Sequence, residues 1–249
     1  MPKLTIDNLQ VEVAEGSTVL QAAQKLGIEI PTLCFHQALG PYGACRVCMV
    51  EAVAHGRTKL ATACTYPAWD GLEVKTNTER VIRARKFALE LLLARCPNVQ
   101  PVQELAKELG VQPGRLKSGE PDEDCILCGM CVRVCRDIVG QSAISFVNRG
   151  IAREVQTPFA EHSEDCIGCG ACAFVCPTGA IKIEDIDQVR KIHYCNTELQ
   201  LVGCADCGRH FATKKELEKL KAKIELPDQT FKLCPDCRRK SLRSSVCQK

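Results

Sequence analysis

The sequence lacks the features that would indicate a membrane protein or an enzyme with a familiar active site. No apolar run approaches the roughly 18 residues of a membrane-spanning helix. The first residues, MPKLTIDNLQVEV, alternate apolar and polar side chains, unlike the apolar stretch of a secretory signal. The 249 residues contain no G-x-G-x-x-G or P-loop pattern for a nucleotide and no Ser/His/Asp arrangement. We therefore expect a soluble protein that does not itself turn over a substrate.

Aromatic residues are scarce and cysteines are abundant. Only 4% of the residues are aromatic, whereas 19 are cysteine. Because aromatic side chains usually supply much of the buried area of a core, metal centres must organise part of this fold. Thiols in such number indicate a reducing compartment, which predicts a cytoplasmic location.

Two cysteine quartets share the spacing C-x-x-C-x-x-C-x-x-x-C, which is typical of 4Fe-4S cubanes. Zinc knuckles and disulfides fit this duplicated spacing less well. The stretch resembles two-cluster ferredoxins, in which the fourth cysteine of each run binds the other cluster. The resemblance implies cluster A on Cys125, Cys128, Cys131 and Cys176, and cluster B on Cys166, Cys169, Cys172 and Cys135. Pro177 follows the second run, and Gly129, Gly168 and Gly170 leave room for backbone N–H groups to approach the sulfides.

A second constellation lies nearer the amino terminus. Its spacing is C-x10-C-x2-C-x15-C, and its members are Cys34, Cys45, Cys48 and Cys64. Four thiolates suit a 2Fe-2S cluster, in which each iron takes two sulfurs. Arg46 lies inside the loop, where it either opposes the negative charge of the cluster or is simply exposed.

The elements around this loop predict a β-grasp ferredoxin domain over residues 1–77. Strands are expected at 4–6, 11–13, 47–53, 59–63 and 72–75, and a helix follows the capping box Thr18–Gln21 and ends at Gly27. The segments IPTLCFH, GACRVCMVE and ATACTYPA resemble the N-terminal region of the large iron–sulfur subunit of complex I. They equally resemble the small diaphorase iron–sulfur subunit of NAD-linked hydrogenases and the N-terminal part of iron-only hydrogenases.

Residues 78–120 are expected to form a helical linker. One helix is predicted over 78–95, with Thr78 as N-cap, and another over 102–109. The family usually follows the first helix with a His-Pro step and three cysteines that bind another 4Fe-4S cluster. Here Cys96-Pro97 replaces that step and no cysteine follows before Cys125. We therefore predict that this cluster is absent and that Cys96 is a packed thiol rather than a ligand.

A two-cluster module is predicted over residues 121–186, with strands at 143–147 and 180–183 and another at 151–156. The last domain, residues 187–249, is predicted to be zinc-ribbon-like. Two C-x-x-C pairs, Cys204 with Cys207 and Cys234 with Cys237, flank a lysine-rich helix that a Thr213–Glu216 capping box opens. Such pairs favour tetrahedral zinc, while a single redox iron and a further iron–sulfur cluster remain alternatives. The overall fold class is α+β.

Other chemistry-bearing residues have plainer interpretations. Cys195 is either an added ligand or, as we favour, a packed thiol, and Cys247 is expected to be exposed. The five histidines lack metal-ligand spacing: His36, His55, His162, His193 and His210. The basic run Arg238, Arg239, Lys240 and Arg243 suits a solvated tail or an acidic partner subunit better than nucleic acid.

The sequence thus favours an electron-transfer subunit with one 2Fe-2S cluster, two 4Fe-4S clusters and one zinc. The resemblance implies partners on both sides: a flavoprotein that handles NADH, and a hydrogenase or formate dehydrogenase catalytic subunit. It also allows a flavin-based electron-bifurcating complex. The alternatives are a free-standing ferredoxin-like carrier and an iron–sulfur redox sensor that binds DNA. We expect a hetero-oligomer with no nucleic acid and no membrane span.

Overall fold

The computed structural model describes residues 1–54, 56–112, 114, 116 and 119–246. It divides into two compact units, each considered by itself. The first comprises residues 1–130 and 177–179, and the second comprises 131–176 and 180–249. Within the described residues, no helix is long and apolar enough to cross a membrane.

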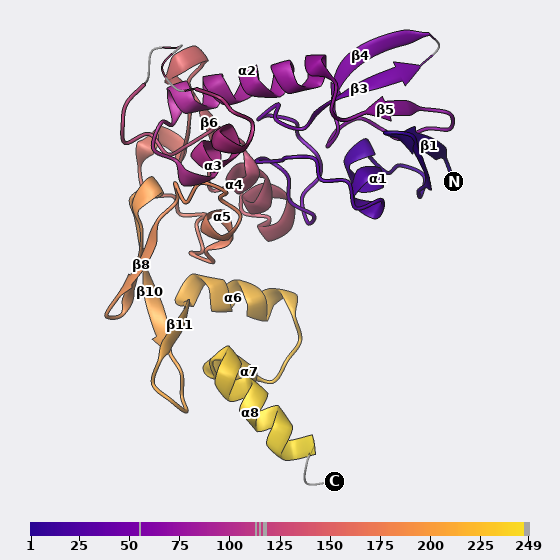
Figure 1. Ribbon diagram of the computed structural model, residues 1–249. Helices are drawn as coiled ribbons and strands as arrows, with labels where there is room; N and C mark the ends of the chain where they lie inside the picture. Colours follow the sequence, from indigo (N-terminus) through magenta and orange to yellow (C-terminus); the bar gives the residue numbers. More distant parts are fainter. Residues whose placement is uncertain (55, 113, 115, 117–118, 247–249) are drawn as a thin grey trace. The chain divides into compact units, whose positions relative to one another are not determined.

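The first unit is built on a five-stranded sheet in the order β2-β1-β5-β3-β4 (Figure 1). Strands β1 and β5 are parallel, and the other neighbours are antiparallel. The elements are β1 (Lys3–Ile6), β2 (Leu9–Glu12), α1 (Val19–Lys25), β3 (Met49–Ala54), β4 (Arg57–Thr62), β5 (Glu73–Lys75), α2 (Glu79–Arg95) and α3 (Gln100–Glu108). Apolar side chains of α1 join those of the sheet in one buried core, which also contains Cys48 and Cys64.

Local signals define the start of this unit, and both helix caps are as predicted. Asp7 and Asn8 both have positive φ, 46° and 70°, so they form the tight turn that suits a right-twisted hairpin between β1 and β2. Thr18 and Gln21 form a complete capping box at the start of α1. Thr78 caps α2 by accepting a hydrogen bond from the backbone N–H of Val81.

Helix α3 begins two residues before the predicted start. Pro101 lies in its first turn, where the missing N–H costs nothing, so the helix includes Gln100 and Pro101. Helices α2 and α3 pack against each other, and α2 also contacts β3.

The second unit carries a four-stranded antiparallel sheet in the order β11-β10-β9-β8 and the small hairpin β6-β7. Its strands are β6 (Ser145–Val147), β7 (Glu154–Gln156), β8 (Ile183–Ile186), β9 (Val189–Ile192), β10 (Thr197–Gly203) and β11 (His210–Thr213). Its helices are α4 (Met130–Arg133, whose first residue belongs to the first unit), α5 (Ala171–Phe174), α6 (Lys214–Lys223), α7 (Asp228–Lys232) and α8 (Pro235–Val246). Short turns of helix are η1 (Val134–Val139, a π-helix), η2 (Gly150–Ala152), η3 (Pro158–Ala160) and η4 (His193–Cys195).

Three strand predictions for the second unit need correction. The strand expected at 143–147 is confirmed only for its last three residues, which form β6. The strand expected at 180–183 is wrong, because only Ile183 is extended there and it begins β8, which pairs with β9. The strand expected at 151–156 is confirmed only for its last three residues, since residues 150–152 form η2. The predicted α6 is confirmed, with Thr213 as its N-cap, whereas β9, β10, β11, α7 and α8 were not predicted.

Candidate metal centres

The four N-terminal cysteines come together in the first unit. Cys34 lies in the long segment between α1 and β3, Cys45 and Cys48 lie just before β3, and Cys64 follows β4. All four are buried, with at most 6% of the residue exposed. The backbone N–H of Cys45 donates to the Cys34 sulfur at 3.4 Å, and the Cys48 and Cys64 sulfurs are 3.4 Å apart.

Crowding of these thiols changes their acidity in opposite directions. Hydrogen bonds from Cys45 and then Cys64 lower the pKa of Cys34 to about 2. The pKa of Cys48 falls to about 7, mainly through its bond with Cys64. The same bonds, with burial, raise the pKa of Cys45 and Cys64. Four thiolates can therefore coexist here only when bound cations compensate their charge, as iron in a cluster does.

The charged residue close to this group is not the one that the sequence suggested. Arg46 is exposed. Arg85 of α2 is instead 6% exposed, and its Nε and Nη2 donate to the Met49 carbonyl at 3.0 and 2.8 Å, one residue after Cys48. Sequence reasoning missed Arg85. The sequence did contain an indication of it. Arg85 lies four residues after Val81 and four before Leu89, so it falls on the buried face of the helix.

The boundary between the units runs through the first of the two cysteine quartets. Cys125 and Cys128 belong to the first unit, whereas Cys131 and Cys176 belong to the second. In the first unit, Arg95 donates to the Cys125 carbonyl at 2.8 Å and pairs with Glu123 at 3.0 Å. Glu123 in turn accepts from the Cys125 N–H at 2.8 Å. The ligand set of cluster A stays a prediction from the sequence.

The cysteines assigned to cluster B line one cavity of the second unit. These are Cys135, Cys166, Cys169 and Cys172. Cys135 lies on the π-helix η1, a rare geometry that is frequent at functional sites. A cavity walled by four thiols, with backbone of a glycine-containing loop around it, fits a cubane cluster.

Cys195 joins the same cavity. It is 4% exposed, and its sulfur hydrogen-bonds with that of Cys166, which lowers the pKa of Cys195. The sequence left a packed thiol and an added ligand as alternatives. The structure places this thiol in contact with Cys166, a predicted ligand, on the wall of the same cavity.

Residues of the following sheet and helix hold the loop of cluster B. Gly168 has φ of 68°, and a Cβ there would lie 2.6 Å from Leu199 Cδ1 and 2.7 Å from Thr213 Cγ2. Arg190 Nη1 donates to the Gly168 carbonyl at 2.8 Å, and the Thr213 hydroxyl donates to the Ile167 carbonyl. Lys215 of α6 donates to the Glu164 carbonyl at 2.8 Å. Only glycine fits at position 168, because any side chain would strike β10 or the N-cap of α6.

The C-terminal cysteines form the tightest group. The sulfurs of Cys204, Cys207, Cys234 and Cys237 all lie within 4.8 Å of one another, and among the described residues only this group has three or more ligand atoms so close. Zinc–sulfur bonds of about 2.3 Å would place the sulfurs about 3.8 Å apart around one tetrahedral ion. The group therefore fits a single ion better than a cluster.

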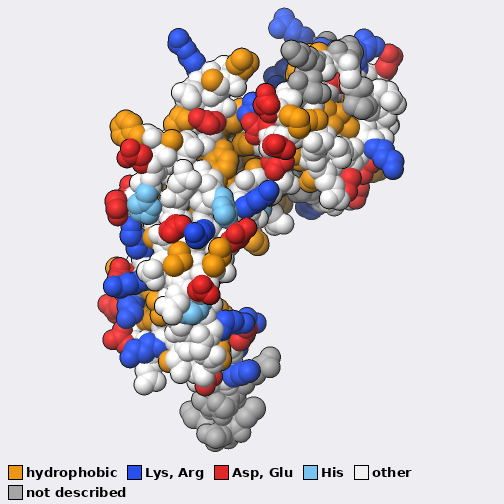
Figure 2. All heavy atoms as spheres, turned by 90° about the vertical axis from the view of Figure 1, so that its left-hand side faces the viewer, with side chains coloured by type: hydrophobic (Ala, Val, Ile, Leu, Met, Phe, Trp, Pro, Cys, Tyr) orange, Lys and Arg blue, Asp and Glu red, His pale blue; other side chains and the backbone are white. Residues whose placement is uncertain are grey.

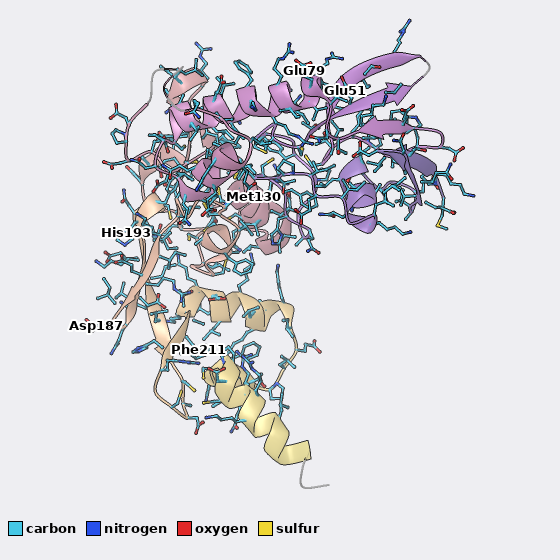
Figure 3. The ribbon with its side chains drawn as sticks, in the orientation of Figure 1. Glu51, Glu79, Met130, Asp187, His193 and Phe211 are labelled. Atoms are coloured by element: carbon cyan, nitrogen blue, oxygen red, sulfur yellow. The ribbon has the colours of Figure 1, made fainter. Side chains whose placement is uncertain are left out.

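Backbone geometry prepares these sulfurs for a cation. Cys204 and Cys207 lie on the knuckle between β10 and β11, whereas Cys234 and Cys237 lie at the first turn of α8. The Cys234 N–H donates to the Cys204 sulfur at 3.2 Å, and such bonds lower the pKa of Cys204 to about 6. Phe211 of β11, labelled in Figure 3, packs against this group and also against Leu217 and Phe231.

The remaining candidates have ordinary surroundings. Cys96 is fully buried, and burial raises its pKa to about 12. His193 pairs with Glu184 at 3.2 Å. His162 pairs with Glu164 at 3.8 Å. His36 and His210 are partly buried and outside any metal-ligand group, while His55 and Cys247 lie outside the described residues.

The basic run at the end of the chain is partly engaged within α8. Arg239 pairs with Asp236 at 3.3 Å, and Arg238 donates to the Leu233 carbonyl at 3.0 Å. On the face drawn in Figure 2, basic and acidic side chains are interspersed. This face therefore offers no continuous basic surface of the kind that follows a nucleic-acid backbone.

Comparisons with known proteins bear on the first three quarters of the chain. Residues 2–79 match the 2Fe-2S iron–sulfur cluster binding domain, and residues 124–180 match the 4Fe-4S dicluster domain. The chain is 34% identical over 180 residues to the 75 kDa subunit of NADH-ubiquinone oxidoreductase of Reclinomonas americana, covering 63% of this chain and 26% of that protein. It is 37% identical over 187 residues to the NADP-reducing hydrogenase subunit HndD of Solidesulfovibrio fructosivorans, covering 64% and 32%.

A solved structure is also similar. One chain of an NAD+-reducing NiFe-hydrogenase in the H2-reduced state matches with a TM-score of 0.56 and 32% identity. The match covers 63% of this chain and 74% of that one. The chain spans only about a quarter to a third of the two curated relatives named above. These matches confirm a 2Fe-2S domain followed by a two-cluster domain.

Proposed function

The chain belongs to the diaphorase-type iron–sulfur subunits of NAD(P)-linked hydrogenases and complex I-type oxidoreductases, and we propose that it relays electrons between a flavin subunit that handles NAD(H) and a separate catalytic subunit. The proposed catalytic partner is a hydrogenase or a formate dehydrogenase. The two subunits would belong to one hetero-oligomer, and electron bifurcation is one mode in which it could work. One observation carries the proposal: a 2Fe-2S domain and a dicluster domain share one chain whose sequence has no nucleotide-binding motif.

The proposed ligands are three sets of four cysteines. Cys34, Cys45, Cys48 and Cys64 would hold the 2Fe-2S cluster, supported by their burial and their sulfur contacts. Cys135, Cys166, Cys169 and Cys172 would hold cluster B, supported by their common cavity. Cys125, Cys128, Cys131 and Cys176 would hold cluster A, supported by spacing alone. Iron–sulfur clusters supply one-electron transfer when bound.

The proposed domains keep the predicted bounds: 1–77, 78–120, 121–186 and 187–249. The strand order and the α1 packing of the first unit support a β-grasp domain. For the last domain we propose one zinc on Cys204, Cys207, Cys234 and Cys237, supported by sulfurs within 4.8 Å of one another. This ion would fix the hairpin β10-β11 to the start of α8, with a structural role.

Metal analysis of the anaerobically prepared chain tests the cofactor content. We expect about ten irons and one zinc per chain from the stoichiometries of these centres. Cys45→Ser should remove about two irons and the 2Fe-2S EPR signal but leave both cubane signals. Cys96→Ser, a change at a buried thiol outside the clusters, should keep all the iron. A Cys45→Ser protein with a normal 2Fe-2S signal would refute the ligand set.

Reconstitution with partners tests the relay. NADH alone should leave the clusters oxidised, whereas NADH with a co-purifying flavoprotein should reduce them. Reduction by NADH without any flavoprotein would contradict the proposal. A chain that purifies alone and exchanges electrons with many soluble donors would identify a free carrier instead.

A further inference from the structure

Arg85 is a buried cation whose position is fixed by a backbone carbonyl. Its residue is 6% exposed, and two of its nitrogens, Nε and Nη2, donate to the Met49 carbonyl oxygen. Met49 begins β3 and directly follows Cys48, a proposed ligand of the 2Fe-2S cluster. The guanidinium is therefore held beside the cluster loop and has little contact with water.

No carboxylate of the described residues forms an ion pair with this guanidinium. Glu51, on the same strand as Met49, pairs with Arg80 at 3.6 Å. Asp7 attracts Arg85 electrostatically, but its carboxylate accepts hydrogen bonds from the N–H and the hydroxyl of Thr76. A buried charge without a partner is costly, so proteins normally pair one.

Coulombic attraction to the Cys48 sulfur supports the charged form of Arg85, against the lowering of its pKa by burial. Four thiolates around two ferric ions and two sulfides carry a net charge of about −2, and one added electron makes it about −3. A cluster with this much negative charge, bound through Cys48, would be the anionic partner that the guanidinium otherwise lacks.

We propose that Arg85 is the counter-charge of the 2Fe-2S cluster and raises its reduction potential. The inference rests on the proposed cluster at Cys34, Cys45, Cys48 and Cys64. A fixed positive charge stabilises the reduced cluster more than the oxidised one, because the reduced cluster carries one more negative charge. Because Arg85 is 6% exposed, salt should screen the effect less than it screens a charge on the surface.

The test is an EPR-monitored redox titration of the full chain with its clusters. In Arg85→Gln the 2Fe-2S signal should persist, with reduction at least tenfold less favourable, equivalent to a potential about 59 mV lower. The two cubane signals in the same sample provide an internal reference. Arg85→Lys keeps the charge and should stay within threefold of the unchanged protein.

The matched control is Arg83→Gln, because Arg83 lies on the same helix with its side chain 77% exposed and paired with Glu79. It should leave the 2Fe-2S potential unchanged. If Arg85→Gln fails to keep the cluster, Arg85→Met, which keeps an unbranched stem without a buried donor, is titrated in its place. An unchanged potential in the neutral variant, or an equal shift in Arg85→Lys, would overturn the inference. Absence of any 2Fe-2S signal in the unchanged protein would instead overturn the proposed function.

Discussion

The 2Fe-2S loop of the first unit and the cluster B loop of the second are held in the same way but differ in charge balance. Arg85 donates to the Met49 carbonyl next to Cys48, and Arg190 donates to the Gly168 carbonyl next to Cys169. Arg190, however, forms two hydrogen bonds with Asp185, at 2.7 and 2.8 Å. Arg85 has no carboxylate paired with it among the described residues.

This difference separates two uses of arginine. A guanidinium neutralised by a carboxylate holds a loop in place but contributes little net charge. A guanidinium without a carboxylate partner also holds a loop in place, but it keeps its net positive charge. It therefore also affects an electron on the neighbouring centre. Arg95 resembles Arg190 in this respect, because it donates to the Cys125 carbonyl and is neutralised by Glu123. Three loops thus share one kind of anchor, and of these three arginines only Arg85 is buried and has no carboxylate paired with it.

The largest effect should come from removing the C-terminal metal ion. Cys204→Ser should lose the zinc and, with it, the order of β10, β11 and the start of α6, which hold the cluster B loop. We expect about four irons to be lost within the time of a chelator challenge, while the 2Fe-2S EPR signal stays. Iron and zinc analysis before and after the challenge measures this.

Cys96→Ser is the matched control, since Cys96 is a buried thiol of the first unit and contributes to no proposed centre. The Cys96→Ser protein should lose iron no faster than the unchanged protein does. If Cys204→Ser lost its zinc but kept cluster B for as long as the control does, the C-terminal domain would not support that cluster.

A smaller effect is expected from one methyl group in the cluster B loop. Gly168→Ala must adopt a left-handed backbone, costing about 1–2 kcal/mol, and must also fit a Cβ against Leu199 and Thr213, costing about 1–3 kcal/mol more. Gly150→Ala has the same left-handed strain, with φ of 61°, but meets nothing within 4 Å. Iron release from cluster B should be at least tenfold faster in Gly168→Ala than in Gly150→Ala. Equal rates would mean that the contacts of Gly168 do not hold the loop.

The first unit was largely predictable because its signals are local. The turn at Asp7-Asn8 and the caps at Thr18 and Thr78 each involve residues within three positions of one another, so the sequence contains the whole interaction. The C-terminal cysteines were also predictable as a group, because two C-x-x-C pairs indicate a shared metal site even when many residues separate them.

Two features that the sequence did not predict depend on which segments pair in the folded chain, one pair distant in the sequence and the other close. Arg85 and Met49 are 36 residues apart, so the sequence shows only a charge at a buried helix position. The strand expected at 180–183 by analogy with the first half of the module was displaced because Ile183 begins a hairpin with Val189–Ile192. In both cases the pairing partner, and not the residue types alone, decided the structure.

The smallest effect should come from removing the neutral pair of the second unit. Asp185 and Arg190 face each other across the hairpin β8-β9, so the double change Asp185→Asn with Arg190→Gln removes one charge of each sign. The net charge near cluster B is then unchanged, and we expect its reduction equilibrium to move by less than threefold in an EPR-monitored titration. The lost bond to the Gly168 carbonyl should show only as a modestly faster release of iron. A shift as large as that of Arg85→Gln would mean that the individual position of a charge, and not its pairing, determines how strongly it acts on a cluster.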